Sequence, residues 1–336
     1  MKGLSGAQMK SLKKIKVQPL AFESFGVRSM CTYVETSDVK ILLDAGVSLG
    51  PNRFGFPPHP KEYSALKKRR ELILRAAEKA DIVTISHYHF DHHTPSFTDW
   101  ANLWSSAEIS AKIYRGKIVF AKNFKSRINF SQRRRGWLFR KKAGSLSSRL
   151  EYADGRSFHF GRTIIRFSPP VFHGREDSEL GWVLMTVIEY EGEKVLYAPD
   201  VQGPICEETL KMILNESADL AIIGGPPLYL ADFRVSKEVI SKALENIAAI
   251  TRHVPVTILD HHVLREKKWR EILQQVIDES SSIGHSLITA AEYAGEPNRL
   301  LEADRKVLFE TEPPSREFMR WSRLPMRKRK LIHPPL

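Results

Sequence analysis

The feature that most constrains this chain is the segment Ser86-His87-Tyr88-His89-Phe90-Asp91-His92-His93. Half of its residues are histidine, although the whole chain of 336 residues contains only 12. An apolar run (82–86) leads into the segment and Thr94-Pro95 follows, so we expect a strand that ends in a histidine-rich loop. In such a loop His87 and His89 can converge on one ion, while Asp91 and His92 turn toward a second. A solvated polar loop is the alternative, but such loops seldom concentrate histidine directly after a buried strand.

Further candidate metal ligands follow other apolar runs along the chain. They are Asp44, His173, Asp200, His261 and His262. If the carboxyl ends of these strands meet at one edge of a sheet, these residues lie together despite their distance in sequence. Taken singly, each aspartate also fits the start of a turn and His173 fits a loop, so only their joint order favours a metal site. Imidazole and carboxylate suit Zn(II), and also Fe or Mn.

The remaining pattern predicts an α/β (α+β) fold. Nine short runs rich in Val, Ile, Leu and Tyr are expected to be strands: 30–35, 40–44, 82–86, 118–121, 163–167, 183–189, 194–198, 220–224 and 256–260. Helical periodicity occurs at 62–80, from a cap at Ser236 to about Arg252, at 269–280 and at 285–294. Early strands are adjacent and later ones alternate with helices, which predicts two stacked mixed sheets covered by helices.

The charge distribution predicts one domain between two basic tails. Residues 1–16 contain five lysines and no acidic residue, and 312–336 is basic and contains proline. We therefore expect tails at 1–16 and 312–336 and a single domain at 17–311. Within that domain, 109–150 is a basic excursion with 13 Lys and Arg residues and no Asp or Glu, against a net charge of +13 for the whole chain.

Composition excludes several classes of protein. The longest apolar runs have the length of a strand, so we expect no membrane-spanning segment and no membrane partner. The two cysteines, Cys31 and Cys206, cannot form a disulfide framework, and no apolar segment of a secretory signal follows the basic start of the chain. We therefore expect a cytoplasmic protein; the sequence leaves its oligomeric state open.

In chain order, the candidate ligands resemble the pattern of the metallo-β-lactamase superfamily. That pattern has Asp, then His-x-His-x-Asp-His, then His, Asp and His, each at the end of a strand. Over residues 17–265 it is matched by Asp44, His87, His89, Asp91, His92, His173, Asp200 and His261. A closer likeness, to an archaeal branch of predicted hydrolases without an assigned substrate, comes from Ser29-Met30-Cys31-Thr32, Pro57-Pro58-His59-Pro60 and Asp260-His261-His262.

The resemblance implies a four-layer αβ/βα sandwich with two divalent metal ions in a cleft at one sheet edge. Zn is the expected ion, with Fe or Mn as alternatives. The implied ligands are His87, His89 and His173 for one ion and Asp91, His92 and His261 for the other, with Asp200 bridging both. Asp44 would orient ligands through hydrogen bonds. His262 is the alternative last ligand, because a shift of one residue reverses the side that faces the metal.

The implied activity is hydrolysis. Two ions about 3.5 Å apart lower the pKa of a bridging water, and the hydroxide attacks an ester, thioester or phosphoester. Asp91 and Asp200 are the candidate catalytic carboxylates. His93, His262 and Tyr88 are the candidate proton donors to the leaving group, and a packing or surface role is the alternative for His93.

The basic excursion bears on the substrate. Arg133, Arg134 and Arg135 lie among Phe and Trp residues, a combination that neutralises phosphates and stacks on bases, although a solvated face without a ligand is the alternative. We expect a small ester or phosphoester substrate. A nucleic-acid phosphodiesterase or nuclease is the alternative function, and a non-hydrolytic metal-binding or scaffold protein is the second alternative. The 60 residues between Asp200 and His261 leave no room for the cap domain of some nucleases.

Overall fold

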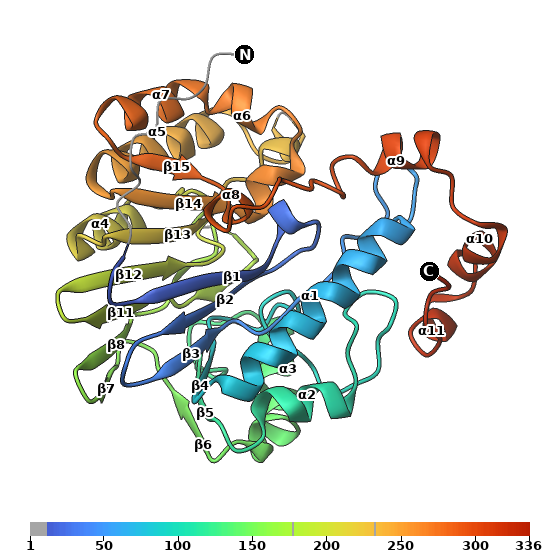
Figure 1. Ribbon diagram of the computed structural model, residues 1–336, viewed down its shortest axis with the longest axis horizontal. Coiled ribbons are helices and arrows are strands. Elements are labelled where there is room, and N and C mark those ends of the chain that lie inside the picture. Colours follow the sequence, from blue (N-terminus) through green and yellow to red (C-terminus); the bar gives the residue numbers. More distant parts are fainter. Residues whose placement is uncertain (1–11, 177, 232) are drawn as a thin grey trace.

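Two mixed β-sheets pack face to face between two layers of helices (Figure 1). The computed structural model describes residues 12–176, 178–231 and 233–336. The first sheet has the order β1-β2-β3-β4-β5-β6, antiparallel from β1 to β3 and parallel from β3 to β6. Its strands are β1 (Lys16–Phe22), β2 (Met30–Glu35), β3 (Lys40–Leu43), β4 (Ile82–Ile85), β5 (Ile118–Ala121) and β6 (Arg149–Tyr152).

The second sheet has the order β15-β14-β13-β12-β11-β8-β7, and β12 to β15 are parallel. Its strands are β7 (Ser157–Phe160), β8 (Thr163–Phe167), β11 (Thr186–Tyr190), β12 (Glu193–Ala198), β13 (Leu220–Gly224), β14 (Val256–Asp260) and β15 (Ser286–Ile288). A separate two-stranded ribbon pairs β9 (Val171–Phe172) with β10 (Trp182–Val183).

Helices cover the outer face of each sheet (Figure 1). The first sheet carries α1 (Pro60–Lys79), α2 (Ala107–Tyr114) and α3 (Phe130–Lys141), and the second carries α4 (Glu207–Glu216), α5 (Lys237–His253), α6 (Trp269–Ile272) and α7 (Gln274–Ser282). The chain ends with α8 (Ala290–Tyr293), α9 (Arg305–Thr311), α10 (Arg316–Ser322) and α11 (Met326–Arg329). In the part of the chain that the structure describes, no helix is long and apolar enough to cross a bilayer.

Strand β3 shows why the central strands are apolar on both faces. Ile41 and Leu43 point into the core between the two sheets, while Leu42 points into the core under the helices of the first sheet. Alternate side chains of a strand point to opposite faces, so a strand covered on both sides becomes a continuous apolar run. This is the four-layer αβ/βα sandwich that the family resemblance implies, and the fold class is confirmed.

Most predicted elements are present, with three differences. The run 183–189 is not one strand, because it is divided between β10 and β11. The helix expected at 285–294 is wrong: residues Ser286–Ile288 form β15, and Thr289 then caps the short helix α8. The helix expected at 269–280 is broken at Leu273 into α6 and α7.

The basic regions are more ordered than the sequence suggests. Block 109–150, expected as an excursion, contains β5 and the start of β6 of the first sheet, as well as α3 and most of α2. At the N-terminal end, residues 1–11 lie outside the described part. The backbone N–H groups of Lys13, Lys14 and Ile15 donate to the carboxylate of Glu193, and Lys16 already belongs to β1.

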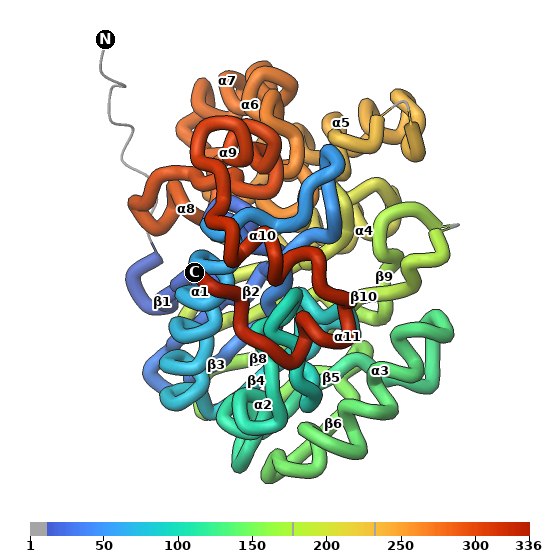
Figure 2. The backbone as a smooth tube through the Cα atoms, turned by 90° about the vertical axis from the view of Figure 1, so that its right-hand side faces the viewer, coloured from blue at the N-terminus to red at the C-terminus, as the bar shows by residue number. Residues whose placement is uncertain are grey.

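The C-terminal segment 312–336 lies across α1 and reaches the loop that precedes α2 (Figure 2). Phe318 and Trp321 of α10 are buried against Tyr63 of α1, with ring centroids 5.7 and 5.3 Å from that of the tyrosine. The backbone N–H of Trp100 donates to the carbonyl of Lys330 at 3.0 Å. Just before this segment, Arg305 of α9 forms a two-pronged pair with Glu62 of α1, with both contacts at 2.8 Å.

We expect Arg305→Ala to lower the free energy of unfolding by about 3–5 kcal/mol, because it leaves the buried carboxylate of Glu62 without its partner. Chemical denaturation measures the effect. Lys306→Ala, at the exposed neighbouring position of α9, is the matched control and should change stability little. Equal stability of the two variants would contradict this role of the ion pair.

Candidate metal centre

The site lies where strands from both sheets end. Asp44 directly follows β3, His87 lies two residues beyond β4, and His173 follows β9. Asp200 lies two residues beyond β12, and His261 follows β14. The parallel strands of each sheet present their carboxyl ends at the same edge, so residues that are up to 217 positions apart in sequence meet there.

The Asp200 carboxylate is the centre of a cluster that it forms with Asp91, His87, His89, His92, His173, His261 and His262. Its Oδ2 atom lies close to four imidazole nitrogens: 2.9 Å from His173 Nε2, 3.2 Å from His87 Nε2, 3.2 Å from His92 Nε2 and 4.0 Å from His89 Nδ1. Its Oδ1 atom lies 2.9 Å from His261 Nε2 and 3.3 Å from His262 Nε2. Asp200 is almost completely buried, so its charge depends on these surroundings.

Two sets of residues around Asp200 have the spacing that a metal ion requires. In each set the candidate ligand atoms all lie within 4.8 Å of one another. The first set is His87, His89, His173 and Asp200, and the second is Asp91, His92 and His261. These are the groups that the family resemblance assigns to the two ions. A third set of Asp200, His261 and His262 overlaps both.

Several buried polar atoms at the centre of the cluster make no hydrogen bond within the described residues. They are His92 Nε2, His173 Nδ1 and Nε2, Asp200 Oδ1, His261 Nε2 and His262 Nδ1. Such atoms are rare in folded proteins because leaving them unpaired is costly. Most of them converge on the same point, and nitrogen with carboxylate oxygen is a donor set for Zn(II) and similar ions. The residues present therefore fit a bound divalent metal.

Three residues of the site have a left-handed backbone conformation. The φ angles are 48° at Asp44, 52° at Asp200 and 69° at His261. A residue other than glycine in this region costs about 1–3 kcal/mol, and such strain concentrates at functional sites. Each of these residues lies within two positions of a strand end, so the conformation turns its side chain back over the edge of the sheet.

Asp44 supports the histidines, as the resemblance implies. Its carboxylate accepts hydrogen bonds from the Ser86 N–H at 2.7 Å, from the Ser86 hydroxyl and from the Tyr197 hydroxyl at 3.0 Å. His92 Nδ1 lies 2.8 Å from the same carboxylate, which fixes that nitrogen as the donor and leaves Nε2 free to face Asp200.

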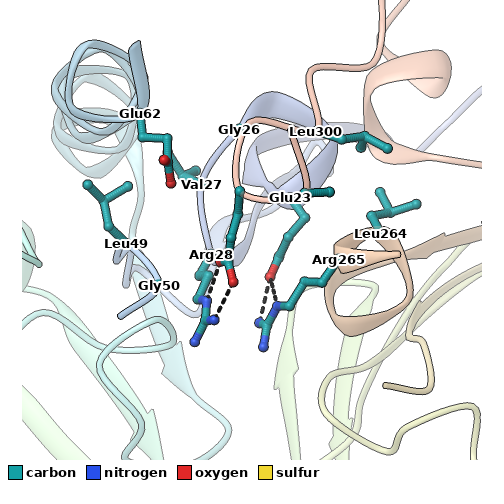
Figure 3. A pocket seen from close by; sticks show the side chains of 12 residues that line it. Glu23, Gly26, Val27, Arg28, Leu49, Gly50, Glu62, Leu264, Arg265 and Leu300 are labelled. Atoms are coloured by element: carbon teal, nitrogen blue, oxygen red, sulfur yellow. Dashed lines mark hydrogen bonds and ion pairs between the residues drawn. The ribbon is translucent and has the colours of Figure 1, made fainter. Parts of the chain in front are cut away.

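Glu23 contacts the candidate site and was not predicted from the sequence. Its Oε2 lies 2.7 Å from His261 Nδ1, and its Oε1 accepts from Arg265 Nε at 2.8 Å. Figure 3 shows Glu23 facing Arg265 with the Arg28 side chain beside them. The one signal in the sequence is an acidic residue directly after the apolar run Leu20-Ala21-Phe22. Glu23 supports His261 as Asp44 supports His92.

Gln132 of α3 is the second missed residue. Although it lies in the basic block, it is completely buried. Its Oε1 accepts from the Tyr88 N–H at 3.1 Å, and its Nε2 donates to the Leu180 carbonyl at 2.7 Å. The same Nε2 lies 3.5 Å from His89 Nε2. Gln132 therefore holds the centre of the histidine motif against α3, and its position inside a charged helix gave no sign of this.

The charges of the cluster depend on one another. Burial by itself would raise the pKa of the Asp200 carboxyl, but His261, His173 and His92 together hold that pKa well below its ordinary value. Burial would lower the pKa of His261, but the carboxylates of Glu23 and Asp200 raise it to about 9. Without a metal ion, His261 therefore carries a proton at neutral pH.

His261 and His262 both reach Asp200, although the sequence analysis treated them as alternatives. Alternation along a strand would send them to opposite sides. The strand β14 ends at Asp260, however, and the two histidines begin the 3₁₀ helix η4 (His261–Arg265), with His261 in the left-handed conformation. His261 is completely buried and its Nδ1 faces Glu23, whereas the His262 side chain is 15% exposed at the cavity wall.

The other two candidate proton donors lie away from the cluster. Tyr88 is completely buried and its hydroxyl donates to the Lys122 carbonyl at 2.6 Å. His93 Nδ1 lies 2.9 Å from the carbonyl oxygen of His89, and burial lowers the pKa of His93 to about 3. His93 is therefore neutral, and its ring packs between Tyr88, Phe90 and Phe139.

A cavity of about 370 Å³ opens over the cluster. His89, Asp91, His173 and Asp200 line its floor, and His262 with three arginines, Arg28, Arg135 and Arg265, lines its walls. Arg28 is paired with Glu302, and Arg265 is paired with Glu23. Of the three adjacent arginines in the basic block, Arg135 reaches this cavity, while Arg133 and Arg134 are exposed on α3.

The layers and the cluster together define a class of protein. Two stacked mixed sheets between helices, with histidines and aspartates gathered at one sheet edge, are the metallo-β-lactamase fold with a buried candidate metal-binding site. The chain belongs to the UPF0282 family, which confirms the expected archaeal likeness. It is 44% identical over 294 residues to the UPF0282 protein of Methanopyrus kandleri, covering 88% of this chain and 99% of that protein.

A second relative is the UPF0282 protein of Thermococcus kodakarensis, 43% identical over 299 residues, covering 89% of this chain and 96% of that protein. No model of a known protein family matches the chain.

Similar solved structures are more distant. The metallo-β-lactamase fold protein YhfI from Bacillus subtilis is 14% identical, with a TM-score of 0.46, and the match covers 82% of this chain and 96% of that chain. Unliganded yeast PDE1 is 10% identical, with a TM-score of 0.49 and the same coverage of both chains. Because these scores are below 0.5, the fold is assigned from the layers and strand order of this chain.

We expect the affinity for Zn(II) to rise with pH up to about 9, because the proton on His261 must leave before its nitrogen can bind a metal ion. Calorimetric titration in buffers of different ionisation enthalpy measures the protons released, and at least one per chain is expected near neutral pH. The Glu23→Gln variant should release fewer protons when it binds the metal, since the substitution removes a carboxylate that raises the pKa of His261. An affinity that does not change between neutral pH and pH 9 would contradict the assignment.

Asp44→Asn should weaken metal binding by about 10–100-fold, because the amide no longer fixes His92 Nδ1 as the hydrogen-bond donor. Tyr197→Phe, which removes only one hydrogen bond to Asp44, should have a much smaller effect. Competition with a chelator of known affinity measures both. Wild-type affinity in Asp44→Asn would remove Asp44 from the support of the site.

Proposed function

We propose that the chain is a metal-dependent hydrolase that acts on an anionic ester, with a phosphoester as the favoured substrate and a carboxylic ester or thioester as the other possibilities. One observation carries the proposal: the buried carboxylate of Asp200 is surrounded by six imidazoles whose facing nitrogens lie within 4.0 Å of its oxygens. Such a cluster is suited to two divalent ions, Zn(II) in the first place, with Fe or Mn as alternatives.

Bound divalent ions would supply Lewis acidity and a water molecule that loses its proton near neutral pH. His87, His89 and His173 would hold one ion, Asp91, His92 and His261 the other, and Asp200 would contact both. Asp91 is the most exposed of these carboxylates, with 18% of its side chain accessible at the cavity floor. Its oxygen is therefore placed to accept a proton from water in the cavity and to orient that water toward a substrate.

His262 is proposed to hydrogen-bond the substrate rather than to protonate the leaving group, because burial and the charges of Arg265 and His261 hold its pKa well below the ordinary value and leave it neutral. It lies in the cavity wall, and its Nδ1 has no hydrogen-bond partner among the described residues. The His261 Nδ1 atom has the carboxylate partner typical of a metal-bound histidine, whereas the His262 Nδ1 atom has none. His261 would thus be the last metal ligand, and His262 would face the substrate from the cavity wall.

The three cavity arginines support an anionic substrate. Arg28 and Arg265 are held by carboxylates on one side, and Figure 3 shows their guanidinium groups pointing the same way. Fixed guanidinium groups bind phosphate oxygens with little loss of conformational entropy. A phosphoester fits this cavity better than a neutral ester does.

Elemental analysis of the purified chain should give two divalent ions per chain, and His89→Ala and Asp200→Ala should abolish metal-dependent turnover of phosphodiester, thioester and lactone substrates. His159→Ala, at an exposed histidine outside the cluster, is the control and should keep full activity. Full activity in either cluster variant would refute the proposal. A chain that binds no metal would favour a scaffold role.

A nucleic-acid phosphodiesterase is the second candidate, and the outer face of α3 favours it. Phe130 is 82% exposed and Trp137 is 47% exposed beside the exposed Arg133 and Arg134. Exposed aromatic rings between cations can stack on bases while the cations contact phosphates. Binding of single-stranded RNA or DNA that falls steeply with salt, and that Trp137→Ala weakens, would support this candidate; salt-independent or absent binding would exclude it.

A further inference from the structure

A second cavity, of about 390 Å³, lies beside the metal-site cavity. Its walls are mainly apolar, formed by Phe90, Pro95, Phe97, Leu138, Phe139 and Leu146. Its polar lining residues are His93, Ser96, Arg135 and the exposed Lys142. Helix α3 and the start of α2 form its rim, because the exposed residues Leu138 and Ala107 both line it. A cavity of this size falls within the range of small-molecule sites, about 300–1,000 Å³.

The two cavities share a wall. Phe90 and Arg135 line both of them, and no other residue does so. Phe90 lies inside the histidine motif between His89 and Asp91, so the apolar cavity adjoins the metal ligands themselves. The guanidinium carbon of Arg135 lies 4.5 Å from the centre of the Phe90 ring, and this contact holds the cation at the boundary between the cavities.

Arg135 differs from the other two arginines of the metal-site cavity. Arg28 and Arg265 are each paired with a carboxylate at close contact, but Arg135 forms no ion pair among the described residues. Its guanidinium donates a hydrogen bond of 3.3 Å to the Tyr88 carbonyl and lies over the Phe90 ring. A cation held in place without a carboxylate partner is suited to bind an anionic group of a ligand.

We infer that these two cavities together bind one substrate: a small anionic ester, with its phosphate at Arg135 and the metal ligands and an aromatic or branched apolar group in the second cavity. This inference rests on the proposed function and specifies its substrate class. The apolar walls would bind the leaving group or the retained group of the ester and exclude water from it. A cation at the shared wall, with the apolar surface on one side and the metal ligands on the other, matches a ligand that is charged at one end only.

Phenylphosphonate and methylphosphonate provide the first test, because both carry the same anionic group and neither is hydrolysed. Isothermal titration calorimetry with the full chain, both metal-loaded and metal-free, should show phenylphosphonate binding at least tenfold more tightly than methylphosphonate. Equal affinities for the two compounds, or binding of neither, would overturn the inference.

Two pairs of variants locate the binding. Ala107→Trp places a large ring into the apolar cavity from an exposed position at the start of α2, so it should abolish the preference for the phenyl compound. Glu108→Trp, at the next exposed position and outside the cavity lining, should keep that preference. Arg135→Gln should lower the affinity for both phosphonates at least tenfold, whereas Arg134→Gln, at an exposed position of the same helix, should leave it unchanged. An Ala107→Trp variant that keeps the full preference would place the phenyl group elsewhere and overturn the inference.

Measurements of turnover distinguish failure of the inferred substrate class from failure of the proposed hydrolase function. If phenyl esters of phosphate are hydrolysed no faster than methyl esters while metal-dependent hydrolysis itself is present, the substrate class fails and the hydrolase remains. If the phenyl preference and its loss in Ala107→Trp are found but no metal-dependent turnover occurs, the cavity remains a ligand site and the hydrolase fails.

Discussion

The structure depends on a buried carboxylate that is surrounded by imidazoles. A carboxylate in a protein interior is strongly destabilising unless positive charge and hydrogen bonds compensate for the lost water. At Asp200 that compensation comes from strand ends of both sheets and from the β9–β10 ribbon. The cluster therefore joins the two halves of the sandwich at one edge. The nitrogen and oxygen atoms at its centre that have no hydrogen-bond partner among the described residues are available to bind cations.

A set of supporting residues holds the cluster, and each comes from a different element. Asp44 lies after β3, Glu23 belongs to the 3₁₀ helix η1 (Glu23–Phe25) and Gln132 belongs to α3. Each fixes one histidine by a contact with the ring nitrogen that faces away from Asp200. The left-handed backbone at Asp44, Asp200 and His261 is tolerated because these contacts and the packing of both sheets over-determine the local conformation.

Charge is distributed differently near the cluster and far from it. Near the cluster, Arg28 and Arg265 are paired with carboxylates of residues that are more than 200 positions away, so their positions are fixed by tertiary contacts. On α3, the basic residues face solvent except for Arg135, which reaches both cavities. One helix of the basic block thus presents a charged outer face and an inner face that shapes the ligand cavities.

The sequence by itself determined the histidine motif, the strand ends that carry Asp44, His173, Asp200 and His261, and the sandwich of two mixed sheets. These follow from local information, since strand-length apolar runs and the residues directly after them are visible along the chain. Glu23, Gln132 and the apolar cavity became visible only in the tertiary structure, because their roles come from contacts between distant elements. The same holds for His261 and His262: strand alternation predicts that one of them faces the cluster, and only the left-handed turn after β14 brings both to Asp200.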